Sequence, residues 1–313
     1  MKKILFSLVF FITSLLSNEL QEAIDNASEG SIITLSKGEY HGNIVINKAL
    51  VIDGIDKKAK IIGDGKGSVI SIKKSNVVIK NLSIENSGFS VEKIDSAIHA
   101  KEVNNITIEN NHISDSLFGI NFEQVNRSKI VDNFITSKDL ELGIRGDGIR
   151  LWNSHDNQLF ANRLYKSRDF VLWYSSGNNI ENNYGSYNRY SLHFMYAGRN
   201  MVRNNFFEYN SVGIFFMYSS GTIAIGNTVK NSLGAFGVGI GMKDSSDFTL
   251  LENNLIYNPR GLYLDQSPYH PRTVNVFERN NILYNSSGVQ FQVSRERSIF
   301  KENVIKGNIE PVV

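Results

Sequence analysis

Residues 183–204 read NYGSYNRYSLHFMYAGRNMVRN, and the next stretch of equal length, residues 205–226, reads NFFEYNSVGIFFMYSSGTIAIG. Each stretch begins with asparagine, and short apolar runs follow at matching places. Working outward in both directions, the same asparagine recurs along most of the chain. We place it at Asn111, Asn133, Asn162, Asn183, Asn205, Asn227, Asn254, Asn281 and Asn303. The basic period is 22 residues, interrupted by three longer intervals.

A period of this size with one recurring turn residue is typical of a solenoid in which each coil hydrogen-bonds to the next. The coils consist of short β-branched runs separated by Gly, Asn, Asp and Ser, with only 4 prolines. Asparagine suits the corner because it tolerates left-handed backbone angles and because its amide both donates and accepts along a ladder of identical neighbours. The sequence therefore predicts an all-β fold, a single-domain right-handed parallel β-helix of the pectin-lyase-like type over residues 30–313, with coils of about 22 residues.

Alternation along each strand separates the interior from the surface, because successive side chains point to opposite faces. Two uniformly apolar columns are expected to fill the interior. They are Ile149, Phe170, Leu192, Ile214, Ile240, Leu262 and Val289, and Leu151, Leu172, Phe194, Phe216, Met242, Leu264 and Phe291. Two mixed columns are expected on the outside. They are Arg150, Val171, His193, Phe215, Gly241, Tyr263 and Gln290, and Trp152, Trp173, Met195, Met217, Lys243, Asp265 and Gln292.

The second outer column places two tryptophans and two methionines in register. Because stacked coils are about 4.8 Å apart, these side chains and Phe215 are expected to form one apolar stripe on the order of several hundred Å². A stripe of that size predicts contact with a partner protein. The alternative is that an insertion folds over the stripe and buries it, and residues 139–146, 233–237 and 268–273 are the candidates.

The N-terminal segment differs from the coils. Residues 1–17 begin Met-Lys-Lys and continue with an apolar run at residues 4–16, which predicts a secretory signal peptide and a location outside the cytoplasm. Residues 18–29 predict a short helix that caps the first coil. Its apolar stripe is Leu20, Ala23, Ile24 and Ala27, and Asn18 with Gln21 can form a capping box at its start.

Composition limits the possible functions. The formal net charge is +2 and no basic run is present, so nothing indicates nucleic-acid binding. The chain has no cysteine, which excludes disulfides, zinc–thiolate sites and cysteine-ligated iron–sulfur clusters. A metal site must therefore use histidine, methionine or carboxylates.

Three residues on the outer face form a candidate metal site. His193 and Met195 lie two apart on one strand, and Met217 lies one coil away from Met195. An imidazole with two thioethers is a soft ligand set that suits Cu(I). The alternative is that the methionines are adaptable apolar residues of a docking surface. His155 and His270 lie in loops beside the stripe, where either can complete a ligand set.

Carbohydrate binding or cleavage is the alternative for an exported β-helix. Cleavage requires paired carboxylates or a calcium cluster with a basic residue. The acidic residues near the outer strands do not form one column; they are Asp147, Asp156, Asp169, Asp244 and Asp265. The pairing of Lys243 with Asp244 and Asp265 is typical of a solvated surface. We therefore expect a protein that is not an enzyme.

Six stretches resemble the NosD family, and the resemblance covers about residues 30–308. They are GDGIRLWNSHDN, RDFVLWYSSGNN, RYSLHFMYAGRN, VGIFFMYSS, VGIGMKDSSD and GLYLDQSP. The matching positions are Arg150, Trp152, Asp169, Trp173, His193, Met195, Tyr196, Met217, Tyr218, Lys243, Asp244, Leu264 and Asp265. NosD proteins are periplasmic β-helix proteins that help to build the copper centres of nitrous oxide reductase.

The resemblance implies a cargo and three partners. The cargo is copper, held transiently as Cu(I) by His193, Met195 and Met217, or a sulfur-containing precursor. The partners are the nitrous oxide reductase apo-enzyme, an ABC transporter made of an ATPase and a membrane subunit, and a copper chaperone lipoprotein. Partner contact is expected at Arg150, Trp152, Trp173, Tyr196, Phe215, Tyr218, Lys243, Asp244 and Asp265. Family members continue past the last coil with a tail that engages the transporter, so we expect this chain to be a fragment or a short variant.

Overall fold

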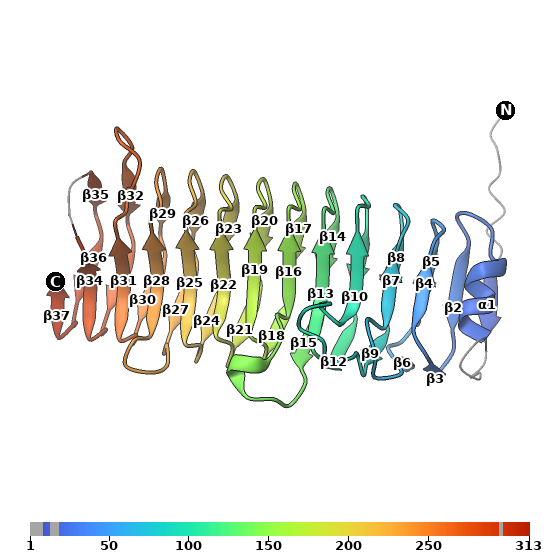
Figure 1. Ribbon diagram of the computed structural model, residues 1–313. Coiled ribbons are helices and arrows are strands. Elements are labelled where there is room, and N and C mark those ends of the chain that lie inside the picture. The colour runs from blue at the N-terminus through green and yellow to red at the C-terminus, as the bar shows by residue number, and fades with distance from the viewer. Residues whose placement is uncertain (1–8, 13–18, 294–296) are drawn as a thin grey trace.

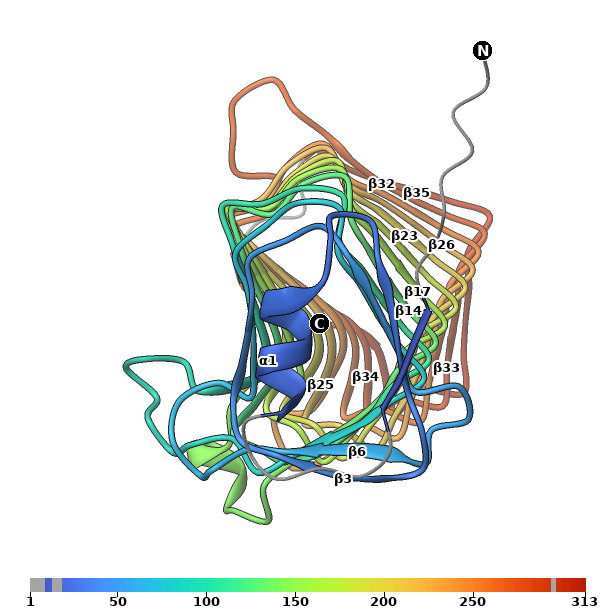
Figure 2. The same ribbon diagram turned by 90° about the vertical axis from the view of Figure 1, so that its right-hand side faces the viewer.

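The computed structural model describes residues 9–12, 19–293 and 297–313, which form a right-handed parallel β-helix of about 12 turns (Figure 1). Three sheets run along its length, and strands of neighbouring coils pair in parallel. The view along the axis shows the coils superposed around a common interior (Figure 2). The predicted fold class is confirmed.

Each coil contributes one strand to each sheet. Sheet 1 contains β1 (Val9–Ile12), β2 (Ile32–Leu35), β5 (Val51–Asp53), β8 (Val78–Lys80), β11 (Thr107–Glu109), β14 (Lys129–Val131), β17 (Gln158–Phe160), β20 (Asn179–Glu181), β23 (Met201–Arg203), β26 (Ile223–Ile225), β29 (Thr249–Leu251), β32 (Asn275–Glu278) and β35 (Ser298–Lys301). Sheet 2 contains β4 (Ile44–Ile46), β7 (Ile70–Ile72), β10 (Ser96–Lys101), β13 (Phe118–Glu123), β16 (Ile149–Trp152), β19 (Asp169–Trp173), β22 (Tyr190–Met195), β25 (Val212–Met217), β28 (Val238–Lys243), β31 (Arg260–Asp265), β34 (Ser287–Phe291) and β37 (Glu310–Val312). Sheet 3 contains β3 (Gly38–His41), β6 (Ala59–Ile62), β9 (Ser83–Glu85), β12 (His112–Ser116), β15 (Phe134–Ser137), β18 (Arg163–Tyr165), β21 (Tyr184–Ser186), β24 (Phe206–Glu208), β27 (Thr228–Lys230), β30 (Asn254–Ile256), β33 (Asn281–Leu283) and β36 (Val304–Lys306).

A buried asparagine ladder lines the corner between sheets 1 and 3. In each coil the side-chain oxygen accepts hydrogen bonds from the amide and the side chain of the preceding ladder residue, as Asn205 does from Asn183 at 2.9 and 3.0 Å. The members are Asn111, Asn133, Asn162, Asn183, Asn205, Asn227, Asn253, Asn280 and Asn303. Placing Asn254 and Asn281 in the ladder was wrong, since they begin β30 and β33 and their neighbours Asn253 and Asn280 form the rungs.

The backbone reason given for the asparagine also needs correction. The left-handed residue at this corner is the one before the ladder residue, for example Ala161 with φ 56° and Glu252 with φ 56°. The chain thus turns at one position, and the buried amide of the next position satisfies the backbone groups that the turn exposes. Only the hydrogen-bonding argument for asparagine holds.

The interior is apolar, as alternation predicts. The two inward columns of sheet 2 are buried throughout, except that Phe291 is partly buried against the same core. Ile52, Ile79, Ile108 and Ile130 continue this core on sheet 1. Burial of such side chains is the main stabilising contribution in a solenoid, because each coil covers the apolar face of its neighbour.

The helix α1 (Glu19–Asn26) lies where the sequence predicts a cap. Leu20, Ile24 and Ala27 are buried, and Ala23 packs against the core. The Gln21 side chain binds the main chain of Val45 in β4, donating at 3.1 Å and accepting at 2.8 Å, so it closes the edge of sheet 2.

The N-terminal predictions are covered only in part. Asn18, the other half of the expected capping box, lies outside the described residues. The predicted signal peptide at residues 1–17 does too, apart from Val9–Ile12, which forms β1 and pairs with β2. Across residues 9–12, 19–293 and 297–313, neither α1 nor the short 3-10 turn Leu142–Ile144 has the length and apolar character needed to cross a bilayer.

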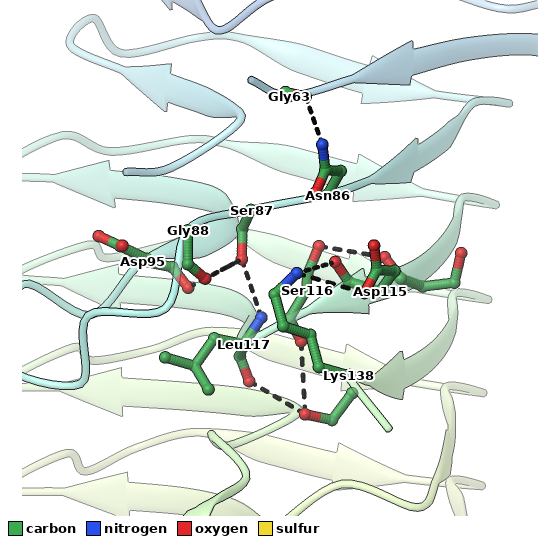
Figure 3. A network of polar contacts seen from close by, with 11 residues as sticks. Gly63, Asn86, Ser87, Gly88, Asp95, Asp115, Ser116, Leu117 and Lys138 are labelled. Carbon is green, nitrogen blue, oxygen red and sulfur yellow. Dashed lines mark hydrogen bonds and ion pairs between the residues drawn. The ribbon is translucent and has the colours of Figure 1, made fainter. Parts of the chain in front are cut away.

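A polar network fastens the corner between sheets 3 and 2 in the first half of the protein (Figure 3). The Ser87 hydroxyl accepts from the Leu117 amide at 2.8 Å and lies 3.2 Å from the Asp95 carbonyl, which ties the loop at residues 87–95 to the next coil. The Lys138 side chain is buried, and its Nζ donates to the carbonyl and the carboxylate of Asp115 at 3.0 and 3.2 Å. This corner is therefore structural, with each buried polar group paired.

Candidate functional site

Sheet 2 presents the two predicted outer columns in register. Arg150 pairs with Val171, Val171 with His193 and His193 with Phe215. The second column contains Trp152, Trp173, Met195, Met217, Lys243 and Asp265, in the order of the coils. All six are half-buried and lie outside the core, so the outward assignment of this column is confirmed. In the first column Val171, His193 and Phe215 are buried, although they do not belong to the interior core.

The structure brings two of the three predicted copper ligands into contact. His193 Nε2 lies 3.2 Å from the Sδ of Met217, and the other ring nitrogen, Nδ1, lies 3.4 Å from Oδ2 of Asp169. Met195 is the register partner of Met217 in the adjacent coil, at the strand spacing of about 4.8 Å. His193 is 8% exposed. Its Nε2 contacts Met217, and its ring stacks on the ring of Tyr190 with the two centroids 4.4 Å apart.

A register shift makes the contact of Asp169 with His193 possible. Asp169 is paired with Tyr190 and Val171 with His193, so β22 contains one extra residue between these pairs. Bulges of this kind redirect side chains and are common beside functional sites. The Asp169 carboxylate and the His193 ring consequently meet although the two residues are not register partners.

Two buried carboxylates, each bound by an arginine, lie in the coils that precede His193. Arg189 donates to both oxygens of Asp169, at 2.9 and 2.6 Å, and Arg168 Nε donates to Asp147 Oδ1 at 2.9 Å. Both carboxylates are nearly inaccessible to solvent. We did not anticipate Arg168, Arg189 or Tyr190 as site residues. The signal was present, because Arg168 and Arg189 follow each other at the coil period, as do Asp147 and Asp169.

The two carboxyl groups differ in their affinity for protons. Burial, and then the negative charge of Asp169, raises the pKa of Asp147 to about 6. Burial also acts to raise the pKa of Asp169, but hydrogen bonds from His193 and Arg189 outweigh it and hold that pKa below its ordinary value. Asp169 is therefore the ionised acceptor that faces His193.

This difference predicts a pH dependence of stability. The pKa of Asp147 rises from 3.8 to about 6 on folding, so its contribution to stability is fully present below about pH 4 and is lost as the pH rises through about 6. We expect Asp147→Asn, which imitates the protonated acid, to lose this dependence. Relative to the variant, the native protein loses on the order of 2–3 kcal/mol between pH 4 and 7. Urea denaturation at four pH values in this window measures the difference, and parallel stability curves contradict it.

An aromatic surface adjoins the His193 cluster. The Trp152 and Trp173 rings lie 6.0 Å apart, and Tyr174 contacts Trp152 edge-on at 5.2 Å. Tyr196 and Tyr218 continue this surface as stacked rings whose centroids are 4.8 Å apart. The insertion at residues 139–146 directly precedes β16 and that at residues 233–237 directly precedes β28, so both lie at the strand starts, whereas Trp152 and Trp173 end their strands.

Phe215 does not belong to the exposed surface. Its side chain is 9% exposed, because its ring lies over Gly241 in the next coil and contacts Tyr190 and Tyr263 at 6.0 and 6.5 Å. A Cβ at Gly241 would lie 2.3 Å from the Phe215 ring, so only glycine permits this packing. The expectation that Phe215 is exposed in the stripe is wrong, so the stripe is smaller than the sequence implied. Contact of Phe215 with a partner stays a prediction.

The other predicted residues lie around this surface. Arg150 donates to Asn121 at 2.9 Å and stands 5.3 Å from the Trp152 ring. Lys243 pairs with Asp265 at 3.5 Å, and Asp244 lies in the turn beside them. His155 bonds to Ser176, while His270 lies with Tyr196 and Tyr218 around a separate pocket, so both histidines lie apart from the His193 cluster.

The donor set fits a soft metal ion. In the described part of the chain, no group of three or more His, Asp or Glu residues is placed to hold a hard cation. Nδ1 of His193 lies 3.4 Å from Asp169, so it can carry the ring proton and leave the lone pair of Nε2 for a metal ion shared with the Met217 sulfur. Nitrogen and thioether donors on a half-buried face suit Cu(I).

The fold and this cluster define a parallel β-helix with soft donors on its outer sheet. A family model described as "Periplasmic copper-binding protein (NosD)" matches residues 140–313, which include every residue of the cluster. The chain belongs to the NosD family.

Solved structures share the fold at low identity. The A-module of mannuronan C-5 epimerase AlgE6 from Azotobacter vinelandii has a TM-score of 0.73 and 14% identity, covering 93% of this chain and 96% of that one. Alginate lyase from Paenibacillus sp. has a TM-score of 0.68 and 16% identity, covering 82% and 99%. PfbA, a surface adhesin of Streptococcus pneumoniae, has a TM-score of 0.69 and 14% identity, covering 91% and 85%. These similarities concern the fold alone.

One curated relative matches part of the chain. A cell surface glycoprotein of Methanothermus fervidus is 32% identical over 106 residues, which is 33% of this chain and 17% of the length of that protein. The match therefore spans a minor part of both proteins.

Proposed function

We propose that this protein is a non-enzymatic periplasmic accessory factor for assembly of the copper centres of nitrous oxide reductase. It holds Cu(I) transiently through His193, Met195 and Met217 and presents Trp152 and Trp173 to the apo-enzyme. Family membership supports the periplasmic location and the copper. The observation on which the site depends is the 3.2 Å approach of His193 Nε2 to the Met217 sulfur on an outer strand.

The chemistry supports transfer rather than storage. A site with one imidazole and two thioethers on a half-buried outer face binds Cu(I) with few ligands, so a better-coordinated acceptor can remove the ion. Asp169 holds the His193 ring through Nδ1, and Arg189 holds Asp169 in turn. The ligand is thus oriented before the ion arrives, which lowers the cost of binding.

The tryptophan pair suits a protein partner. Aromatic side chains are enriched at the centres of protein interfaces, where they bury large areas with little loss of conformational freedom. Trp152 and Trp173 lie in the same column as Met195 and Met217. A client enzyme bound over the tryptophans is therefore brought beside the copper ligands. The resemblance to the family adds two further partners to this proposal. The lipoprotein chaperone would donate copper, and the ABC transporter would act together with this protein.

Competition for Cu(I) tests the site. We expect the double variant Met195→Ala, Met217→Ala to bind Cu(I) at least about tenfold more weakly than the native protein, because two of three soft donors are lost. The matched control is Met201→Ala, which removes a half-buried methionine from β23 on sheet 1 and should leave affinity within about twofold. Titration against a coloured Cu(I) chelator under reducing conditions measures both. Equal affinity of the native protein and the double variant removes these residues from the proposal.

Two other functions are outcomes of related experiments. If the protein binds the apo-reductase equally well with and without copper and shows no Cu(I) affinity, it is a docking scaffold or a carrier of a sulfur precursor. If it acts on carbohydrate, acidic polysaccharides incubated with it yield unsaturated products. We expect none, since Asp147 and Asp169 are buried against arginines and are not free to act as a catalytic pair.

A further inference from the structure

A column of turn residues runs beside the copper and tryptophan column and ends in a pocket. The turn after each of the five consecutive strands β19, β22, β25, β28 and β31 has a left-handed residue at the same place, with φ between 46° and 52°. Its amide donates to the carbonyl that ends the next strand, as Tyr218 does to Lys243 at 2.9 Å. The column is Tyr174, Tyr196, Tyr218, Asp244 and Gln266.

The aromatic part of this column stops at Tyr218. The rings of Tyr174 and Tyr196 stack at 5.2 Å, and those of Tyr196 and Tyr218 at 4.8 Å. The next position holds Asp244, a carboxylate one coil beyond the last ring. Asp244 therefore places a carboxylate at the position where a further aromatic ring would continue the stack.

The loop at residues 268–273 forms the opposite wall, and it is held firmly. The Ser246 hydroxyl accepts from the amides of both Tyr269 and His270 at 2.9 Å. Arg297 donates to the carbonyls of Pro268 and Thr273 at 3.0 and 3.3 Å. The wall is thus fixed by contacts from two neighbouring coils, so the pocket is formed before any ligand binds.

The pocket between these walls encloses about 420 Å³ and is lined by Tyr196, Tyr218, Asp244, Gln266, Tyr269 and His270. Among the described residues, Oδ1 of Asp244 is buried without a hydrogen-bond partner. Because Oδ1 is covered, Oδ2 is the oxygen of Asp244 that can accept from a ligand in the pocket, and the aromatic rings around it attract positive charge. Lys243 attracts Asp244 through its charge, but its Nζ pairs with Asp265 Oδ2 at 3.5 Å.

The geometry points to a primary ammonium group as the ligand. A quaternary ammonium has no N–H to offer to Asp244, and a guanidinium is best bound by two acceptor oxygens in one plane, whereas only one oxygen of Asp244 can face the pocket because Oδ1 is covered. We propose that this pocket binds a primary ammonium group, either of a lysine side chain on a protein or of a small free amine. The copper ligands take no part in it, so the pocket is independent of the copper site, although Tyr196, Tyr218 and Asp244 are also expected partner contacts.

Ligand-observed NMR tests the proposal with N-acetyl-lysine amide as the probe. We expect saturation transfer from the native protein to this probe and none to N-acetyl-norleucine amide, whose side chain has the four carbons of lysine and no charge. Asp244→Asn should weaken binding at least about tenfold, because the carboxylate loses its charge. The matched control is Asp247→Asn, an exposed residue with φ 58° that also carries a left-handed backbone, and it should bind like the native protein.

Equal binding by the native protein and Asp244→Asn, or no binding of the lysine probe by the native protein, overturns the proposal. A peptide with an internal lysine distinguishes the sources. Binding at least as tight as that of the amide assigns the pocket to a protein side chain, whereas exclusion of the peptide assigns it to a free amine. The Met195→Ala, Met217→Ala variant should retain lysine binding, so failure of the copper site and failure of this pocket are observed separately.

Discussion

Replacing Asn253 by alanine is expected to lower the free energy of unfolding by about 3 kcal/mol. The Asn253 side chain donates to Ala224 and Asn280 at 2.9 Å each and accepts from the amide and the side chain of Asn227 at 3.0 and 2.9 Å. The ladder is buried, so the amide of Asn227 is left without an acceptor and water does not replace the lost oxygen.

The neighbouring residue provides the control. Asn254 is half-buried on the outer side of β30, where it donates to Thr228 at 3.3 Å and accepts from Asn281 at 2.8 Å. Water can take over both contacts, so Asn254→Ala should cost less than about 1 kcal/mol. Urea denaturation measures both variants, and hydrogen exchange of the coils around Asn227 shows where the native protein opens. Equal losses would falsify the assignment of Asn253 to the ladder.

Replacing Asp169 by alanine is expected to destabilise the protein by about 2 kcal/mol, because its hydrogen bonds to Arg189 and His193 are lost, and to weaken Cu(I) binding about 10- to 100-fold. Asp169 is buried and is bound by Arg189 through two hydrogen bonds. Its loss leaves a cation without its partner beside the apolar strand. It also removes the group that faces His193 Nδ1, so the ring is no longer fixed for metal binding at Nε2. The copper effect depends on the proposed function, and the loss of stability does not.

Two conservative variants separate these effects. Asp169→Asn keeps the shape of the side chain, so a folded protein remains in which Cu(I) affinity can be measured by chelator competition. Asp147→Asn changes the other buried carboxyl group, which bonds to Arg168 and not to His193, and should leave Cu(I) affinity within about twofold. If both variants bind copper as the native protein does, Asp169 has no positioning role.

The fold could be predicted from the sequence because two periods act together. The 22-residue spacing determines which residues stack, and the two-residue alternation determines which of them face inward. The sequence prediction was wrong where two adjacent residues fit the 22-residue period equally well. Asn253 and Asn254 are adjacent asparagines, and only the distance to the next buried residue, Leu255, shows that the first belongs to the ladder.

The candidate site could be predicted only in part. His193, Met195 and Met217 follow from register, but the approach of Asp169 to His193 depends on an extra residue in β22 that periodicity does not reveal. The burial of Phe215 depends on a ring lying over a glycine in the next coil, which is a matter of side-chain torsion. Contacts between residues of neighbouring coils that are not register partners therefore cannot be predicted from the 22-residue spacing.

The stacking of similar coils places the outward side chains of sheet 2 at a constant spacing along the axis. Each coil advances the chain by about 4.8 Å along the axis without turning any outward side chain inward. Trp173 and Met195 lie in adjacent coils, so insertion of a whole coil between them would lengthen the distance from a docked enzyme to the metal site by about 4.8 Å and leave the residues at both ends unchanged. In such a protein the number of coils determines the distance between two sites, and this number can change without a change in the residues of either site.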